Sequence, residues 1–467
     1  MTYSYNFNQD ICRVKEYIRN NRDRFFEELF TLLRIPSISA RKEHKPDMVR
    51  CAETLRTLLL EAGADEAGVY PSDGNPVVFG QKIVNPEWKT VLVYGHYDVQ
   101  PPEPLDKWVS DPFEPVIRKD AQGRDAIWCR GANDDKGQLF MHIKAFEHQV
   151  RTGKLHHNVK FIFEGEEEIG SPSLAAWVRD HKDWLGADVI LVSDTTMISE
   201  EVPSINCGMR GLAYLEVTVT GPDHDLHSGH YGGAVANPIQ TLCDMISSLI
   251  GKDGRVTVPG FYDDVIELSD SDRAQLARVP FDPVEFNKSL GVKALRGEEG
   301  YSPMERIGIR PCLDVCGIWG GYTGEGAKTV LPSTAHAKIS MRLVPAQDSA
   351  KITSLFKEHL ERIAPEYCRI DVKPCEGGEG FLIPISSPAF RAASRAMTDV
   401  YGIEPVPSRG GGSIAVLASM QKILGVDPLL MGFGLERDTI HSPNESFLLS
   451  QFFAGMESIS KFYEYYD

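Results

Sequence analysis

The strongest chemical signal in the sequence is an apolar run that ends in a histidine and a carboxylate. Residues 91–95 read Val-Leu-Val-Tyr-Gly, and His96 and Asp98 follow closely. Such near-continuous hydrophobicity is typical of a buried strand in a parallel sheet. Side chains two residues apart on a strand point to the same face, so His96 and Asp98 can serve one site. A metal-bound histidine usually donates its second ring proton to an acceptor, which makes Asp98 a candidate for orienting His96.

Further residues that can bind metal or move protons occupy comparable positions later in the chain. Two more apolar segments, 159–163 and 189–192, lead directly into acidic residues. Other candidates precede a predicted helix or lie in a late loop. The whole additional set is Glu167, Glu168, Asp194, Asp134 and His441. Because the carboxyl ends of parallel strands meet at one edge of a sheet, we expect these side chains to converge.

Carboxylates that converge in this way repel one another. At ~4 Å and an effective dielectric constant of ~20, each like-charged pair costs about 4 kcal/mol. Protons or cations must therefore lie among them, and the histidines favour cations. Imidazole and carboxylate ligands suit zinc, and also manganese or cobalt. Asp134 has one oxygen for each of two metals, and paired metals suit hydrolysis by a bridging water. Of the adjacent Glu167 and Glu168, one can bind metal while the other takes a proton.

The hydrophobic periodicity predicts the elements that must position these groups. Amphipathic helices are expected over about 10–34 and 47–62, and strand, acidic loop and helix then alternate up to Asp194. This alternation predicts an α/β fold with a mostly parallel sheet flanked by helices. The later strands 212–220 and 335–344 alternate apolar and polar residues, as a half-buried antiparallel sheet does.

A chain of 467 residues exceeds what one hydrophobic core usually organises, so two domains are expected. We predict a catalytic, metal-binding domain made of residues 1–208 and 384–467. An α+β domain, residues 209–383, is inserted into it as a lid or dimerisation domain. Within the inserted domain, residues 254–310 show no clear period and have no role that the sequence identifies.

The composition restricts the partners and the compartment. The 49 basic and 66 acidic residues give a formal net charge of −17, which argues against nucleic acid or an anionic membrane surface as a partner. No apolar run approaches the ~20 residues that span a bilayer, and no signal peptide is evident. The nine cysteines are odd in number and form no CxxC motif, which favours reduced thiols and a cytoplasmic location.

Two other stretches contain ligand-like or phosphate-loop-like residues. Residues 223–230 are rich in histidine and aspartate, but the strand-end groups already account for the metals, so no separate site is predicted. In residues 320–329, Ala327 separates Gly326 from Lys328, where a phosphate loop needs glycine and lysine to be adjacent. A nucleotide-binding function is therefore not expected.

Taken together, the motifs resemble those of the dinuclear metallopeptidases of the aminoacylase and carboxypeptidase G superfamily. The resemblance is strongest to the branch of the cytosolic non-specific dipeptidase and carnosinase. The stretches that carry it follow the family's order: GHYDVQPP (95–102), RGANDDKG (130–137), EGEEEIGS (164–171), SD (193–194), DLHSGHYGG (225–233), GAKTV (326–330), RLVP (342–345), GGGSI (410–414) and HSPNE (441–445). Single motifs of this kind are weakly specific, but the ordered set is highly specific.

The resemblance implies two divalent metal ions, with zinc favoured and manganese or cobalt as alternatives. It implies two ligand groups that share one residue: His96, Asp134 and Asp194 for one ion, and Asp134, Glu168 and His441 for the other. It further implies that Glu167 is the general base and that Asp98 is the partner of His96. The peptide bond between Asp134 and Asp135 is expected to be cis.

The resemblance also implies how the substrate is bound. His227 is expected to reach the active site of the neighbouring subunit of a homodimer, where it stabilises the oxyanion. The substrate's carboxylate end is expected to contact Thr329, Arg342 and Ser413.

The predicted function is that of a metal-dependent exopeptidase that hydrolyses dipeptides by a metal-activated bridging water. Two alternatives stay open. The first keeps the chemistry and changes the substrate, making the protein an N-acyl amino acid or carbamoyl amide hydrolase. The second is a non-catalytic, metal-dependent binding protein. The sequence does not determine the metal or the side-chain preference.

Overall fold

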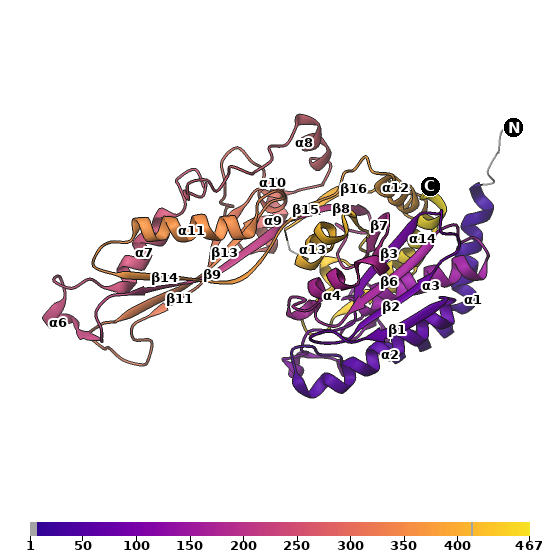
Figure 1. Cartoon of the computed structure of the whole chain (residues 1–467), viewed down its shortest axis with the longest axis horizontal. Coiled ribbons are helices and arrows are strands. Elements are labelled where there is room, and N and C mark those ends of the chain that lie inside the picture. The colour runs from indigo at the N-terminus through magenta and orange to yellow at the C-terminus, as the bar shows by residue number, and fades with distance from the viewer. Residues whose placement is uncertain (1–6, 412–413) are drawn as a thin grey trace. The chain divides into compact units, whose positions relative to one another are not determined.

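The computed structural model describes residues 7–411 and 414–467 (Figure 1). Its contacts divide the chain into two compact units. The first unit comprises the chain up to Cys207, Ile383–Pro407 and Ser419–Asp467, and the second comprises Gly208–Leu382 and Ser408–Ala418.

The short segment 408–418 differs from the sequence prediction, which includes it in the catalytic domain. In the structure it belongs to the second unit, where Arg210 Nε donates a hydrogen bond to the carbonyl oxygen of Gly411 (3.2 Å). Hydrophobic periodicity carries no information about a contact between residues this far apart in the sequence.

The first unit contains most strands of the larger sheet. Its elements are α1 (Phe7–Leu33), α2 (Lys45–Ala62), β1 (Glu66–Tyr70), β2 (Val77–Lys82), β3 (Thr90–His96), β4 (Val116–Lys119), β5 (Asp125–Trp128), α3 (Lys136–Arg151), β6 (Asn158–Glu164), α4 (Leu174–Asp180), α5 (Lys182–Leu185), β7 (Val189–Val192), α12 (Pro388–Tyr401), β17 (Pro428–Leu430), β18 (Ser446–Leu448) and α14 (Leu449–Tyr465). Short 3₁₀ turns lie at Lys42–His44, Leu105–Lys107, Glu167–Ile169 and Glu436–Asp438. Three elements lie where the chain passes between the units: β8 (Ser204–Met209), β16 (Val406–Gly410) and α13 (Ala415–Leu424).

The strand order of the larger sheet is β1-β2-β6-β3-β7-β17-β8-β15, and β16 pairs with β8. Strands β6, β3, β7 and β17 are mutually parallel, whereas β1, β2, β8 and β15 pair in antiparallel fashion. The predicted parallel sheet flanked by helices is therefore confirmed for the central strands. The register pairs His96 with Glu164 and Tyr94 with Val192, so β3, β6 and β7 end at the same edge.

Both faces of the central strands are buried, which explains why β3 reads as an unbroken apolar run. Val91 and Val93 belong to the core cluster that also contains residues of α1, α2, α3 and α14. Near β2 the opposite face packs against Trp184 of α5, whose ring lies 5.7 Å from that of Phe79. With both faces covered, the exposed edge of the sheet is where polar side chains can gather.

A second, smaller sheet of the first unit was not predicted from the sequence. Its strand order is β18-β5-β4, and β18 pairs with β5 in antiparallel fashion. The backbone N–H of Cys129 then donates to the carbonyl oxygen of Glu445 (3.2 Å). This pairing brings the late loop that carries His441 back to the segment that carries Asp134.

The second unit is an α+β arrangement around a four-stranded antiparallel sheet of order β11-β13-β9-β14. Its elements are β9 (Gly211–Thr220), β10 (Leu226–His227), α6 (Ser228–Tyr231), α7 (Pro238–Ser248), α8 (Asp270–Leu276), α9 (Pro283–Ser289), α10 (Pro303–Gly308), β11 (Cys312–Gly320), β12 (Val330–Leu331), β13 (Thr334–Leu343), α11 (Ser349–Ile363), β14 (Arg369–Gly378) and β15 (Phe381–Leu382). Alternate residues of β9 are buried, as the sequence pattern predicts, and α7 and α11 pack against this sheet.

Residues 254–310, which the sequence describes as loop-like, contain the short helices α8, α9 and α10. Glu298 and Arg310, both almost completely buried, hold this segment together through two hydrogen bonds of 2.8 Å. Among the described residues, no helix combines the length and the apolar character needed to cross a membrane.

Glu147, in α3, provides a test of how the first unit is stabilised. Its buried carboxylate accepts hydrogen bonds from Arg24, from Lys144 Nζ (2.8 Å) and from Tyr17 Oη (2.7 Å). Although burial raises the pKa of Glu147, Arg24 and Lys144 lower it to about 2. A depressed pKa in the folded state stabilises the protein above the unfolded-state pKa, and the stabilisation is lost as the pH falls toward 2.

We therefore expect Glu147→Gln to destabilise the protein near neutral pH by about 3 kcal/mol, and by less at about pH 3. Chemical denaturation of variant and wild type at the two pH values measures the difference. Glu53→Gln, which removes an exposed glutamate paired with Arg56, is the control and should change little at either pH. An equal loss for Glu147→Gln at both pH values would contradict the assigned role.

Candidate metal centre and active site

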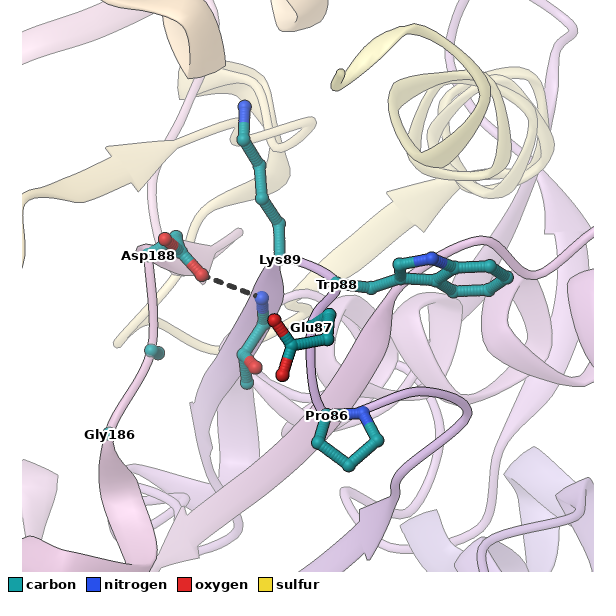
Figure 2. A pocket seen from close by; sticks show the side chains of 8 residues that line it. Pro86, Glu87, Trp88, Lys89, Gly186 and Asp188 are labelled. Carbon is teal, nitrogen blue, oxygen red and sulfur yellow. Dashed lines mark hydrogen bonds between the residues drawn. The ribbon is translucent and has the colours of Figure 1, made fainter.

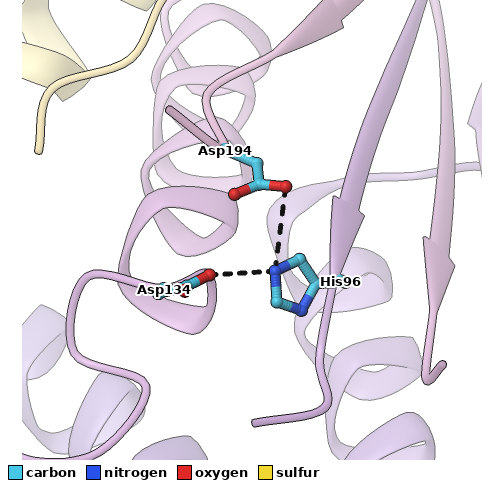
Figure 3. Close-up of side chains that lie close together, drawn as sticks. All are labelled: His96, Asp134 and Asp194. Carbon is cyan, nitrogen blue, oxygen red and sulfur yellow. Dashed lines mark hydrogen bonds and ion pairs between the residues drawn. The ribbon is translucent and has the colours of Figure 1, made fainter. Parts of the chain in front are cut away.

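Three potential ligands converge where the central strands end. His96 is the last residue of β3, Asp194 follows β7, and Asp134 precedes α3. His96 Nε2 lies 3.1 Å from Asp134 Oδ1 and 3.8 Å from Asp194 Oδ2, and Figure 3 shows all three side chains directed at one point. The sheet register therefore assembles the first group that the sequence resemblance implies.

A second group forms on the other side of Asp134. His441 Nε2 lies 2.8 Å from Asp134 Oδ2 and 3.1 Å from Glu168 Oε2. Glu168 stands in the 3₁₀ turn after β6, and His441 in the loop that β18 brings back. Asp134 thus directs one oxygen at each histidine, which is the arrangement of a bridging ligand.

The spacing of these atoms fits divalent metal ions. Within each group the ligand atoms all lie within 4.8 Å of one another. Two ligand atoms at ~2.0–2.1 Å from a tetrahedral zinc ion are about 3.3 Å apart. The four distances of 2.8 to 3.8 Å between imidazole nitrogen and carboxylate oxygen bracket this value. Nitrogen and oxygen donors without thiolate suit zinc, manganese or cobalt.

In the metal-free protein, protons offset the charges of the converging groups. Hydrogen bonds to Asp134 and Glu168 raise the pKa of His441 to about 10. Burial lowers the pKa of His96, but hydrogen bonds to Asp134 and Asp98 more than compensate and raise it well above its usual value. Burial likewise raises the pKa of Asp134, but the two histidines hold it well below its usual range. The bridging carboxylate is therefore anionic between two imidazolium groups.

The neighbouring carboxyl groups respond in the opposite direction. Burial, reinforced by the other carboxylates, raises the pKa of Asp194 and of Glu167. The charges of Asp194, Glu168 and Asp134 act on Glu167, so its carboxyl group lies among the candidate ligands without belonging to either group. A carboxyl group at this position can accept a proton from a reacting water.

Asp98 supports both sides of the centre. Its Oδ1 lies 3.3 Å from His96 Nδ1, and the same oxygen accepts a hydrogen bond from the backbone N–H of Glu167 (3.2 Å). Its Oδ2 accepts from the backbone N–H of Glu168 (3.1 Å). One buried carboxylate therefore orients the imidazole ring and anchors the 3₁₀ turn that carries Glu167 and Glu168.

Two supporting residues had no role in the sequence prediction. Gln100 donates to Glu168 Oε2 from its Nε2 (2.8 Å) and to Oε1 from its backbone N–H (3.2 Å). Asp135 accepts a hydrogen bond from the backbone N–H of His96 (3.1 Å). Gln100 lies within the motif at 95–102 and Asp135 within that at 130–137, and membership of these motifs is the signal that marks them. The peptide bond between Asp134 and Asp135 is cis, which confirms that expectation.

The substrate-binding residues suggested by the resemblance lie in the second unit or outside the described residues. His227 pairs with Val330 across β10 and β12, and the carbonyl oxygen of Thr329 accepts from the backbone N–H of Ser228 (3.1 Å). His227 and Thr329 are exposed neighbours, and His227 Nδ1 accepts from the backbone N–H of Gly229 (3.0 Å). Ser413 lies outside the described residues.

Arg342 stands at the other end of the sheet of the second unit. It is half-buried near the end of β13, where it pairs with Cys312 of β11 and Leu212 of β9. It is eight residue steps along β13 from Thr334, a span of about 26 Å at ~3.3 Å per residue. The segment of His227 and Thr329 joins the sheet at the Thr334 end, where the backbone N–H of Ser333 donates to Asp225 Oδ1 (2.8 Å). The structure therefore does not bring these two residues together with Arg342.

The histidine-rich segment 223–230 forms no additional metal group. Among the described residues, only the two groups that share Asp134 bring three ligand atoms together. The His227 and His230 rings stack on each other at 4.4 Å.

A pocket of about 390 Å³ lies elsewhere in the first unit, lined by residues 86–90 and 186–188 (Figure 2). It lies at the amino ends of β3 and β7, where Asp188 Oδ2 accepts from the backbone N–H of Thr90 (2.8 Å). Thr90 and His96 are at opposite ends of β3, about 20 Å apart at ~3.3 Å per residue. The pocket is therefore separate from the candidate metal centre.

Comparison with known proteins places these features in context. The model of the peptidase family M20/M25/M40 matches residues 92–465. The chain is 32% identical to a Cys-Gly metallodipeptidase of Schizosaccharomyces pombe over 95% of this chain and 96% of the relative. It is 30% identical to a human Beta-Ala-His dipeptidase over 97% and 92% of the respective chains. Among solved structures, an M20 family metallo-carboxypeptidase of Sulfolobus solfataricus aligns with a TM-score of 0.84 at 33% identity, covering 95% of this chain and 99% of that one.

The protonation of the centre predicts that metal binding releases protons. His441, with its pKa raised to about 10, carries a proton at neutral pH in the metal-free protein, whereas a metal ligand must be neutral imidazole. Calorimetric titration of zinc into metal-free protein should therefore give heats that depend on the ionisation enthalpy of the buffer. The apparent affinity should rise with pH. Heats that are independent of the buffer would contradict this protonation state, and His224→Gln, which changes an exposed histidine, should release as many protons as the wild type.

Proposed function

This chain belongs to the peptidase family M20/M25/M40, and on that premise we propose that it is a metal-dependent exopeptidase that hydrolyses dipeptides. The observation that carries the proposal is the position of Asp134, whose two carboxylate oxygens face His96 and His441 separately. A carboxylate shared in this way suits two adjacent metal ions. The relatives named above as metallodipeptidase and dipeptidase support the choice of substrate class.

Two divalent ions would occupy the centre, with zinc the first choice and manganese or cobalt the alternatives. His96, Asp134 and Asp194 would hold one ion, and Asp134, Glu168 and His441 the other. When bound, the two ions supply an acidified water as nucleophile and polarise the scissile carbonyl group.

The residues of the chain carry out the proton transfers. Glu167 accepts the proton of the attacking water and later delivers it to the leaving amine, which requires a carboxyl group that is not committed as a ligand. It lies beside the candidate ligands without belonging to either ligand group, which suits a proton acceptor. Asp98 keeps Glu167 in place because its Oδ1 accepts a hydrogen bond from the backbone N–H of Glu167.

Substrate recognition is assigned to residues of the second unit. The guanidinium fork of Arg342 suits the terminal carboxylate of a peptide, which it can bind in bidentate fashion. Thr329 and Ser413 would add hydrogen bonds at the same end of the substrate. His227, which is exposed, would donate a hydrogen bond to the oxyanion as it develops.

We further propose that the active protein is a homodimer. A dipeptide spans only about 7 Å, whereas about 26 Å of β13 separates the Thr334 end, near His227, from Arg342. Residues of one chain therefore cannot all contact one substrate, and a second copy must supply some of them. Strand β11 is an edge strand with exposed apolar side chains at Val315, Ile318 and Trp319, a surface suited to pairing with another chain.

The proposed location is the cytoplasm. Cys51 and Cys129 in the first unit are free thiols. Free thiols are typical of proteins kept in a reducing compartment.

Substitution of the general base tests the proposed chemistry. Glu167→Gln should retain both metal ions but lower kcat for dipeptide hydrolysis by about 10²–10⁴-fold, because the water loses its proton acceptor. Metal analysis of the purified variant and steady-state kinetics measure the two effects. Glu43→Gln, which changes an exposed glutamate in another 3₁₀ turn, is the control. Retained activity in Glu167→Gln would refute the assignment of the base.

The substrate class is tested with the wild-type protein loaded with zinc. Rates on a panel of dipeptides should exceed those on N-acyl amino acids and N-carbamoyl amino acids. The reverse order would favour the alternative amide hydrolase, and hydrolysis of none of these would favour a binding protein.

The dimer can be tested by mixing two inactive variants. A mixed dimer of His227→Ala and Glu167→Gln chains contains one active site in which both residues are intact. Subunit exchange in an equimolar mixture should restore about a quarter of wild-type activity, because about half of the dimers are mixed and each has one good site. The absence of complementation, although sedimentation shows mixed dimers, would refute the crossing of His227.

A further inference from the structure

A completely buried carboxylate, that of Glu445, lies beneath the candidate metal centre and belongs to neither ligand group. Its Oε2 accepts hydrogen bonds from Arg130 Nη1 (2.8 Å) and from the backbone N–H of Gly131 (3.0 Å). Its Oε1 accepts from the backbone N–H groups of Asn133 (2.9 Å) and Asp134 (3.1 Å). All four of these groups donate hydrogen bonds to the carboxylate.

These donors tie Glu445 to the segment that carries the bridging ligand. Three of the four are backbone amides of residues 131–134, which lead directly into Asp134. A carboxylate bound by several backbone N–H groups constrains the position of the peptide units and not merely of a side chain. The placement of the Asp134 carboxylate between two histidines therefore depends on Glu445.

Glu445 also belongs to the loop that carries the ligand His441. The strand β18 that follows it pairs with β5, and the carbonyl oxygen of Glu445 accepts from the backbone N–H of Cys129 (3.2 Å). Arg130 extends the connection, since its Nη2 lies 3.4 Å from the carbonyl oxygen of Ser442, next to His441. The pair of Glu445 and Arg130 thus joins the two segments whose ligands meet at 2.8 Å.

We propose that Glu445 is a positioning residue of the metal centre, which sets the separation of Asp134 and His441 and thereby the affinity for the metal ions. The inference rests on the proposed function, since it requires that these two residues bind metal. It adds a residue that bonds to no ion and whose effect passes through Asp134.

A general role in stability is the alternative, and Glu147 provides the comparison. Glu147 is also a buried carboxylate bound by an arginine in the first unit, but its partners Arg24, Lys144 and Tyr17 are side chains of α1 and α3. None of these partners is a candidate ligand or bonds to one of the ligand-carrying segments. Loss of either carboxylate should therefore lower stability, whereas only the loss of Glu445 should change metal affinity.

The experiment measures the zinc affinity of Glu445→Gln by competition with a chromophoric chelator, beside the wild type and the matched control Glu147→Gln. Glutamine retains the shape and one acceptor oxygen but turns an NH₂ group toward N–H donors. We expect zinc affinity to fall about 10–100-fold in Glu445→Gln, as for other residues that support metal ligands, and to stay at the wild-type value in Glu147→Gln. Activity of Glu445→Gln should recover as the zinc concentration is raised, with KM for the dipeptide little changed.

Wild-type zinc affinity in Glu445→Gln would overturn the inference, as would an equal loss in Glu147→Gln. Should Glu445→Gln not fold, Arg130→Lys provides the second test. It retains the positive charge but cannot contact Glu445 and Ser442 together, so zinc affinity should fall by a smaller factor, and an unchanged affinity would overturn the inference. A wild-type protein that binds no zinc, manganese or cobalt would instead refute the proposed function itself, and the inference with it.

Discussion

The constraint on which the structure depends is that carboxylates from distant parts of the chain share one edge of a sheet. Asp134, Asp194, Glu167 and Glu168 converge there together with two imidazole groups. At an effective dielectric constant of ~20, each close pair of like charges costs about 4 kcal/mol. The raised pKa of His441 and of Asp194 shows how the metal-free protein meets this cost by holding protons. Divalent cations also offset the repulsion between the carboxylates, and they supply chemistry that protons do not.

Such a concentration of charge requires a rigid support, and the structure provides it mainly through backbone N–H groups. Asp98 anchors the turn of Glu167 and Glu168, Asp135 accepts from the backbone of His96, and Glu445 anchors the segment of Asp134. Each of these carboxylates is itself buried, so its hydrogen bonds are strong and its loss would leave donors unsatisfied. The supporting residues therefore fix the candidate ligands through carboxylate groups. Carboxylates are also the donor groups of Asp134, Glu168 and Asp194.

The second unit obeys a different geometric constraint. Its antiparallel sheet is long enough to keep His227 and Thr329 at one end and Arg342 near the other. A small substrate cannot span that length, so a function that needs all three residues needs two copies of the chain. The exposed edge of β11 offers a surface on which such an assembly can form. The proposed homodimer therefore rests on the length of this strand and on the proposed substrate contacts.

By itself, the sequence determined the residue types at the strand ends, their order and the central parallel strands, because hydrophobic periodicity and strand-end polarity are local properties of the chain. It also identified His96, Asp134, Glu168, Asp194 and His441 as candidate ligands. The resemblance already implied that Asp134 is shared between the groups of His96 and His441. Only the tertiary structure decided that residues 408–418 pack with the second unit and that Glu445 lies beneath Asp134. Glu445 and Asp134 are 311 residues apart, and no pattern along the chain encodes the hydrogen bond between them. Such contacts follow from strand register and close packing, which exist only once the whole chain has folded.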